Sequence, residues 1–210
     1  MASSVPEAPD MPKYVSSTST TITIGWRNVP DNGGSPVTLF KIYSASGLTG
    51  DTFSLIGSTD DLEFTLDNSV LTQFVTGQIY KFQITAINSI GESEPSLDLA
   101  VLLKPLPSAP AAPTVDLSRS TLTSAYVQWI SPGSDTTGYR LYMSEEGEGV
   151  FRMIYDGSTN DDVTYANVTG LITGESYSFY VEALNFNGVG SPSAETFAYI
   201  CLAPWGFAVP

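Results

Sequence analysis

Residues 171–193 read LITGESYSFYVEALNFNGVGSPS, and residues 74–96, FVTGQIYKFQITAINSIGESEPS, carry the same pattern 97 positions earlier. Aligned without a gap, the two copies have the same residue at several positions, among them Gly77 and Gly174, Phe82 and Phe179, Ala86 and Ala183, Asn88 and Asn185, Gly91 and Gly188, and Pro95 and Pro192. A pattern repeated at such a spacing indicates two copies of one folding unit. The chain of 210 residues is therefore expected to form two domains of about a hundred residues each.

Each copy contains a segment in which apolar and polar residues alternate. In the later copy the alternation puts one set of side chains on a common face, namely Tyr177, Phe179, Val181 and Ala183. The earlier copy does the same with Tyr80, Phe82, Ile84 and Ala86. Such alternation predicts a half-buried β-strand. Residues 185–190 then predict a turn, in which Gly188 is free to adopt a positive φ.

Shorter apolar or alternating segments predict further strands in both halves. In the first half they are residues 20–27, 37–44, 53–57, 62–66 and 97–103. In the second half they are the segment with Ala125, Val127 and Trp129, the segment with Tyr139 and Leu141, and residues 151–155, 163–168 and 194–202. No segment places apolar residues at helical spacing, so the fold class is predicted to be all-β with almost no helix.

Proline-rich segments mark the expected domain boundaries. Residues 104–113, KPLPSAPAAP, favour an extended, semi-rigid linker that would space two domains end to end. We therefore predict a first domain at residues 1–104, a linker at 105–113 and a second domain at 114–203. The prolines of this linker recur 97 positions later, so residues 204–210 are expected to begin a linker to a further, missing domain.

The charge and the cysteine content exclude several classes of protein. The chain has 22 acidic and 8 basic residues, a net charge of −14, and no cluster of the Lys and Arg that phosphate backbones require. No nucleic acid partner is therefore expected, and no apolar run approaches the roughly 20 residues of a membrane helix. A single cysteine, Cys201, excludes an intrachain disulfide.

Nothing in the sequence points to catalysis. The chain has no histidine, which removes Ser/His/Asp and Cys/His catalysis and most zinc sites. No glycine-rich phosphate loop is present. Acidic residues cluster at 60–61, 145–148 and 161–162, but they lack the spacing of a calcium loop and are interpreted as solvated turns. We predict that the chain is not an enzyme and has no catalytic residue, cofactor or metal site. A weak cation site at the turns of Asp60 or Asp161 is the alternative interpretation of these acids.

Four motifs together resemble those of fibronectin type III domains. Each half has a tryptophan on its second strand, a Leu/Phe-x-x-Gly-x-x-Tyr corner, an alternating strand ending in Ala-x-Asn, and a Gly-x-x-x-Pro-Ser ending. Residues 32–36, NGGSP, are similar to a loop of the same family. The resemblance covers nearly the whole chain. It implies two immunoglobulin-like (fibronectin type III) β-sandwiches in tandem, with seven strands each.

The residues behind this resemblance are expected to be structural. Trp26 and Trp129 each supply a large wedge between two facing sheets. Tyr80 and Tyr177 are expected to bury the ring and to bond a nearby backbone group through the hydroxyl. These four residues are the predicted structural core.

Two surface features point to contacts with other molecules. Asn167, followed by Val168 and Thr169, is a predicted acceptor for N-glycosylation. Tyr43 and Tyr142 would face outward, where they would form either a contact patch or a cross-strand aromatic packing.

Function is predicted only in general terms. We expect a non-catalytic structural spacer or adhesion segment of a large multidomain protein, at the cell surface or outside the cell. Its partners would be neighbouring domains of the same array and, on the alternative below, a protein ligand, and the segment itself would be a monomer. Three alternatives remain open: a recognition module of a receptor-type ectodomain, an accessory region of a large secreted enzyme, and a part of an intracellular scaffold.

Overall fold

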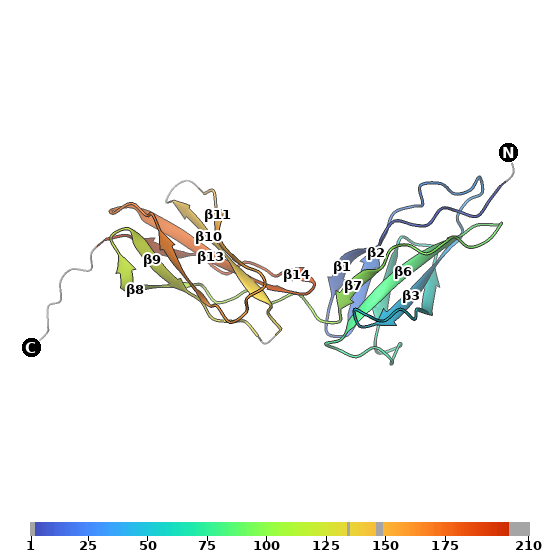
Figure 1. The fold of residues 1–210 in the computed structure, drawn as a ribbon, viewed down its shortest axis with the longest axis horizontal. Coiled ribbons are helices and arrows are strands. Elements are labelled where there is room, and N and C mark those ends of the chain that lie inside the picture. Colours follow the sequence, from blue (N-terminus) through green and yellow to red (C-terminus); the bar gives the residue numbers. More distant parts are fainter. Residues whose placement is uncertain (1–2, 134, 146–148, 202–210) are drawn as a thin grey trace, which may run out of the picture. The chain divides into compact units, whose positions relative to one another are not determined.

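The computed structural model describes residues 3–133, 135–145 and 149–201, and it divides the chain into two compact units, Met1–Pro105 and Leu106–Pro210 (Figure 1). Every regular element among the described residues is a strand, as the sequence predicted. Accordingly, no helix of the described residues has the length and hydropathy that crossing a bilayer would require.

The first unit is a sandwich of two antiparallel sheets. One sheet has the order β1-β2-β5 and the other β4-β3-β6-β7. The strands are β1 (Lys13–Ser17), β2 (Thr21–Gly25), β3 (Leu39–Ser46), β4 (Ser54–Thr59), β5 (Glu63–Asp67), β6 (Ile79–Ile87) and β7 (Leu99–Leu102).

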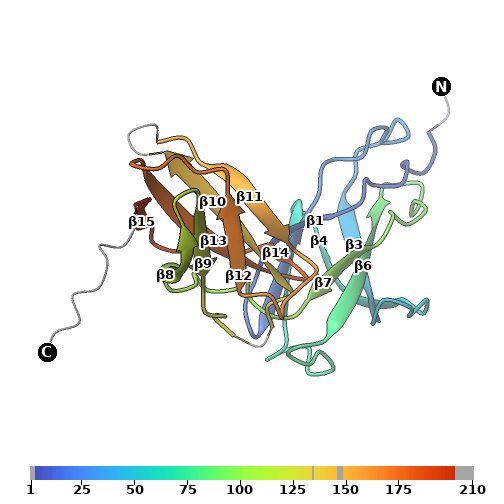
Figure 2. The same cartoon turned by 60° about the vertical axis from the view of Figure 1, so that its left-hand side comes forward.

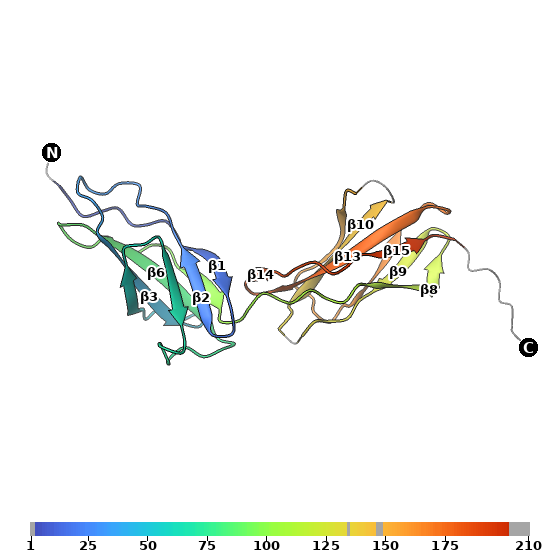
Figure 3. The same ribbon diagram turned by 180° about the vertical axis from the view of Figure 1, so that it is seen from behind.

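The second unit repeats this architecture, as Figures 2 and 3 show from two other directions. One sheet has the order β12-β9-β8; in the other, β11-β10-β13-β14, β15 also pairs with β13. The strands are β8 (Thr114–Thr121), β9 (Ser124–Gln128), β10 (Gly138–Glu145), β11 (Arg152–Gly157), β12 (Tyr165–Thr169), β13 (Ser176–Asn185), β14 (Gly188–Val189) and β15 (Thr196–Tyr199).

The described strands number seven in the first unit and eight in the second, against seven predicted for each. The additional strand is the two-residue β14, which extends the hairpin that β13 begins. Its counterpart in the first unit is a single bridge between Ile87 and Glu92. Gly188 in this turn has φ 141°, the positive value that the turn requires.

Each unit encloses its own apolar core, and a tryptophan lies in each. Trp26 is 8% exposed and packs edge-on against Phe40, with ring centroids 5.5 Å apart. Trp129 is 5% exposed and lies 5.7 Å from Tyr139. Both follow directly after a strand, β2 or β9, and extend its ladder by one further backbone bond from the tryptophan N–H.

A tyrosine closes each core at its corner. The hydroxyl of Tyr80 accepts a hydrogen bond from the backbone N–H of Val75 at 2.7 Å. In the second unit the hydroxyl of Tyr177 accepts one from Ile172 N–H at 2.9 Å. Both rings are almost fully buried. Each tyrosine therefore satisfies a backbone donor five residues before it that no strand pairs.

The Pro-Ser ending of the repeat also bonds a backbone group. The N–H of Ser96 donates to the carbonyl of Ile84 at 2.9 Å, and its Oγ accepts from the N–H of Ile84 at 3.1 Å. Ser193 makes the same pair of bonds to Val181, at 2.9 and 3.0 Å. In each unit one serine thus forms hydrogen bonds with both the N–H and the carbonyl of a residue in the central strand. These are the backbone groups that a neighbouring strand would otherwise pair.

Asn88 holds the end of β6 to two loops of the first unit. Its Nδ2 donates to the carbonyls of Ser4 at 2.7 Å and Asn32 at 2.9 Å, while its Oδ1 accepts from Ile90 and Gly91. Gly33 beside Asn32 has φ 69°, and a Cβ there would lie 2.3 Å from the Ser4 carbonyl oxygen. The NGGSP loop therefore needs glycine because the lead-in segment lies directly against it.

Replacement of Tyr80 by Phe removes the hydroxyl and leaves the Val75 N–H without its acceptor in the partly buried corner. We expect the free energy of unfolding of the first unit to fall by roughly 1–3 kcal/mol, measured by urea denaturation. Tyr177→Phe should do the same in the second unit. Tyr199→Phe is the matched control, because that tyrosine is 56% exposed. An equal effect of all three substitutions would contradict the assigned role of the corner hydroxyl.

Candidate functional site

The two units allow a comparison between features that serve the fold and features that serve something else. Both copies must bury the same kind of core, so a feature present in both follows from the shared architecture. A feature present in one copy alone is not required by that architecture. Candidate functional residues are therefore sought where the copies differ.

Open grooves beside the core tryptophans occur in both units. In the first unit a groove of about 540 Å³ is lined by Tyr14 and Trp26 among others. In the second unit one of about 340 Å³ is lined by Tyr126 and Trp129 among others. Both indole N–H groups are buried and have no hydrogen-bond partner among the described residues. Because the arrangement is repeated, we assign it to the sandwich.

The outer face of the β4-β3-β6-β7 sheet carries a polar cluster in the first unit. Glu92 accepts hydrogen bonds from Lys41 Nζ at 2.6 Å, from the Tyr43 hydroxyl at 2.8 Å and from Thr85 Oγ1 at 2.6 Å. Lys41 and Thr85 are directly opposite each other on β3 and β6. The cluster therefore joins two strands to the turn that follows β6.

These bonds shift the ionisation of the groups involved. The bonds from Lys41 and Thr85, together with that from Tyr43, lower the pKa of Glu92 from 4.5 to about 2, against the smaller opposing effect of burial. The bond to Glu92 raises the pKa of Lys41. Burial first, and then the bond to Glu92, raise the pKa of Tyr43. The cluster is thus charged as an ion pair over the whole neutral range.

A second cation on the same outer face is held among acids and a ring. Lys81 is only 8% exposed. Its Nζ lies 3.2 Å from an Asp98 carboxylate oxygen, 3.5 Å from one of Asp51, and 5.3 Å from the centre of the Phe53 ring. Lys81 of the first unit thus fills the space between this ring and these acids on the outer face.

The corresponding face of the second unit is aromatic. Tyr142 and Tyr180 are directly opposite on β10 and β13 and stack with centroids 4.7 Å apart, and Phe151 lies 4.8 Å from Tyr180. On β15, Phe197 is 69% exposed and Tyr199 56% exposed. We refer to these five residues as the aromatic face. Figure 3 shows β13 between β10 and β15, the strands that carry four of these residues. Phe151 directly precedes β11.

Carboxylates lie close to the aromatic face. Burial, followed by the charge of Glu182, the neighbouring Tyr142 and the charge of Glu195, raises the pKa of Tyr180. Burial and then Glu182 raise the pKa of Tyr142 as well, partly through a hydrogen bond to that carboxylate. Arg140 acts on Tyr142 in the opposite direction but does not outweigh these causes. Both tyrosines therefore stay protonated at neutral pH, and the rings lie among two carboxylates and one guanidinium group.

The sequon asparagine, the cysteine and the described turn acids that the sequence pointed to lie at the surface of the two units. The side chain of Asn167 is exposed on β12, where glycosylation requires it to be. Cys201 follows β15 and is exposed. Asp60, Asp61, Asp161 and Asp162 are exposed, and no group of three or more His, Cys, Asp or Glu among the described residues could hold a metal ion. Glu146, Glu148 and residues 204–210 lie outside the described part of the chain.

Several residues of these outer faces were not predicted from the sequence. Tyr43 and Tyr142 were predicted to face outward, whereas Glu92, Lys81 and Phe197 were not singled out. These residues could have been found by comparing equivalent outward positions of the two copies, because residues 97 positions apart differ there. Lys81 corresponds to Ser178, and Ala100 corresponds to Phe197. Within one copy these residues read as ordinary solvent-facing positions of a strand.

Replacement of Glu92 by Gln should destabilise the first unit by about 1 kcal/mol at pH 7, because it breaks a partly exposed ion pair with hydrogen bonds. A lowered pKa means that the carboxylate stabilises the fold above pH 4.5 and that this contribution disappears as the pH falls through about 2. Urea unfolding at pH 7 and near pH 2 should therefore show the difference between variant and parent shrinking. Glu94→Gln, at an exposed position two residues on, is the control. A difference that does not depend on pH would contradict this account.

Comparisons with known proteins agree with the architecture. The chain is 26% identical over 201 residues to mosPTP-1 of Aedes aegypti, whose name describes a receptor-type tyrosine-protein phosphatase; the match covers 90% of this chain and 15% of that protein. It is 27% identical over 190 residues to the human Fibronectin type-III domain-containing protein 3A, covering 89% of this chain and 15% of that one. This chain thus spans about 15% of the length of these relatives.

A shorter match and a solved structure add to this. The mouse protein "Cell adhesion molecule-related/down-regulated by oncogenes" is 36% identical over 92 residues, covering 43% of this chain and 7% of that protein. The crystal structure of chicken CNTN1 FN1-FN3 domains superposes with a TM-score of 0.55 at 15% identity, covering 96% of this chain and 67% of that one. The family model "Fibronectin type III domain" matches residues 7–101 and again residues 108–199. The chain belongs to the fibronectin type III family and comprises two of its domains in tandem.

Proposed function

We propose that the chain is a non-catalytic spacer or adhesion segment within a longer array of domains. Fibronectin type III domains are themselves non-catalytic, including those in relatives whose names describe an enzyme. The chain covers only a small part of each relative, so it represents a repeat segment of large multidomain proteins. The specific mechanical or adhesive role is our inference from the following features.

The observation that carries the proposal is that each unit is complete in itself. Each has its own core, its own tryptophan and its own corner tyrosine, whose hydroxyl bond lies within the same unit. A unit built in this way needs no neighbour for stability, and copies can be added to an array without changing any core. That independence is what a spacer or adhesion segment requires.

We further propose that the parent protein places this segment at the cell surface or outside the cell. The exposed side chain of Asn167 supports this location, because N-glycosylation occurs in the secretory pathway. The match to a protein described as receptor-type supports it too. The neighbouring domains of the array would be its constant partners.

A spacer should hold its two units apart in solution as a monomer. A compact globule of 210 residues would have a radius of gyration of about 17 Å. We expect small-angle scattering to give a clearly larger value, together with a monomeric mass. Replacing Pro105, Pro107, Pro110 and Pro113 by serine should shorten or broaden the distance distribution, since proline stiffens the linker. A compact particle or a stable dimer would contradict the spacer role.

The proposed location has a separate test. When the chain is secreted from mammalian cells behind a signal peptide, we expect a mass increase that peptide N-glycosidase F removes and that Asn167→Gln abolishes. Asn160→Gln, in the exposed β11–β12 turn and outside any sequon, is the matched control. Secretion without any modification at Asn167 would remove the main support for the extracellular assignment.

A further inference from the structure

The outer faces of the two units can be matched residue by residue through their strand registers. Tyr43 lies opposite Gln83 in the first unit, and Tyr142 lies opposite Tyr180 in the second. Further along, Lys81 lies opposite Ala100, whereas Ser178 lies opposite Phe197. The backbone positions are therefore equivalent, while the side chains on them differ.

The most informative difference concerns Lys81. In the first unit its ammonium group lies over the Phe53 ring and beside the Asp98 carboxylate. The ring and the acid both have counterparts in the second unit. Phe151 directly precedes β11 as Phe53 directly precedes β4, and Glu195 stands 97 positions after Asp98.

The lysine itself has no counterpart. Its position in the second unit holds Ser178, which is 6% exposed and lies opposite Phe197. Glu195 directly precedes β15, as Asp98 directly precedes β7, and its charge contributes to the raised pKa of Tyr180. The second unit therefore keeps a ring and an acid like those around Lys81 but has no cation at that position. The cation at the other end of the face, Arg140, acts on Tyr142 and lies 3.6 Å from Asp156.

The second unit also has no spare positive charge to place there. Residues 106–210 contain three arginines, no lysine and eleven acidic residues, a net charge of −8. Arg119 lies 3.6 Å from the centre of the Tyr126 ring, Arg140 is 3.6 Å from Asp156, and Arg152 is 3.9 Å from Glu145. Each arginine thus lies beside an acid or a ring of the same unit.

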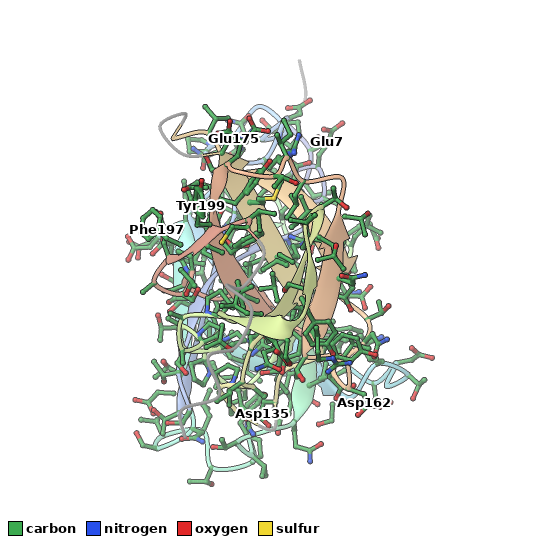
Figure 4. All side chains as sticks on the ribbon, turned by 90° about the vertical axis from the view of Figure 1, so that its left-hand side faces the viewer. Glu7, Asp135, Asp162, Glu175, Phe197 and Tyr199 are labelled. Atoms are coloured by element: carbon green, nitrogen blue, oxygen red, sulfur yellow. The ribbon has the colours of Figure 1, made fainter. Side chains whose placement is uncertain are left out.

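We propose that the aromatic face of the second unit binds a lysine or arginine side chain from an extended segment of a partner protein. The cation would lie against Phe151 and Tyr180 near Glu195, as Lys81 lies against Phe53 near Asp98. A cation over an aromatic ring is attracted by the negative charge of the ring face. The exposed rings of Phe197 and Tyr199, which Figure 4 shows projecting away from the ribbon, would cover the aliphatic stem and the adjoining residues of the partner.

Charge favours this occupant over a second copy of the chain. The full chain carries −14, so two copies brought face to face would repel each other. A basic segment gains from the same charge. The proposal is also independent of the spacer role, because a face on one unit can bind whether or not the array separates its domains.

The test uses the full chain and the fluorescein-labelled peptide GSKTKTKSG, with the same peptide acetylated at every lysine as its uncharged match. Binding is followed by fluorescence anisotropy at about 0.15 M salt, where charges more than about 8 Å apart are largely screened. We expect the lysine peptide to bind and the acetylated peptide to bind at least about tenfold more weakly. Amide shift changes in a nitrogen-15 spectrum should fall on β10, β13 and β15.

Ser178→Lys is the decisive variant, since it gives the second unit the residue that the first unit already has. It should weaken peptide binding by about tenfold or more, because the variant fills the site with its own lysine. Phe197→Ser, at a highly exposed position that cannot affect the core, should weaken binding several-fold. Glu195→Gln should also weaken it. Phe186→Ser in the β13–β14 turn and Asp161→Asn in the β11–β12 turn are matched controls off the face, expected to change binding by less than about twofold.

The proposal would be overturned by unchanged binding in both Ser178→Lys and Phe197→Ser, by equal binding of the acetylated peptide, or by shift changes confined to the first unit. Sedimentation that reveals a dimer lost on Phe197→Ser would instead assign the face to a second copy. An intact fold of Ser178→Lys is checked by circular dichroism. If that variant does not fold, Phe197→Ser and Glu195→Gln decide the question by themselves.

Discussion

The stability of each unit depends on side chains that form hydrogen bonds with backbone groups left unpaired by the strands. A buried N–H without an acceptor costs roughly 1–3 kcal/mol, a large fraction of what a domain of this size has in total. Tyr80 and Ser96 meet this need in the first unit, through a phenol and a serine hydroxyl. The equivalent bonds of Tyr177 and Ser193 have nearly the same lengths in the second. The repeated sequence is therefore a repeated set of solutions to one hydrogen-bonding requirement.

This explains why so much of the fold could be predicted from the sequence. The groups that satisfy these bonds stand at fixed, short offsets from the groups they serve, so the pattern survives in both copies even where the apolar residues differ. The ends of the strands were harder to predict. Trp26 and Trp129 alternate with the residues before them, yet each lies one step beyond its strand. β1 and β8 show little alternation of burial, and they form because a neighbouring strand offers a ladder, which no local pattern reveals.

The outer faces were less predictable, for a different reason. Glu92 meets Lys41 and Tyr43 across about fifty positions of sequence. Lys81 meets Phe53 and Asp98 only once the four strands β4, β3, β6 and β7 are in register. Nothing in the spacing of single residues encodes such meetings. Tyr142 was noticed, but its stacking on Tyr180 depends on the β10–β13 register. The sequence therefore predicts that a side chain faces outward, but it does not predict which other side chains it contacts.

The difference between the two outer faces also bears on how such arrays acquire function. Outward positions contribute little to the core, so Lys81 in one copy and Ser178 in the other are both compatible with the same sandwich. In the first copy Lys81 already occupies the Asp98 carboxylate and the Phe53 ring, so a cation from a partner would gain little binding energy there. The second copy has Phe151 and Glu195 but carries a serine in place of the lysine. On our proposal, a cation from a partner therefore takes the position that Lys81 occupies in the first copy. Loss of a single internal charge, with its surroundings kept, is therefore enough in physical terms to turn a self-contained repeat into one that recognises a cation.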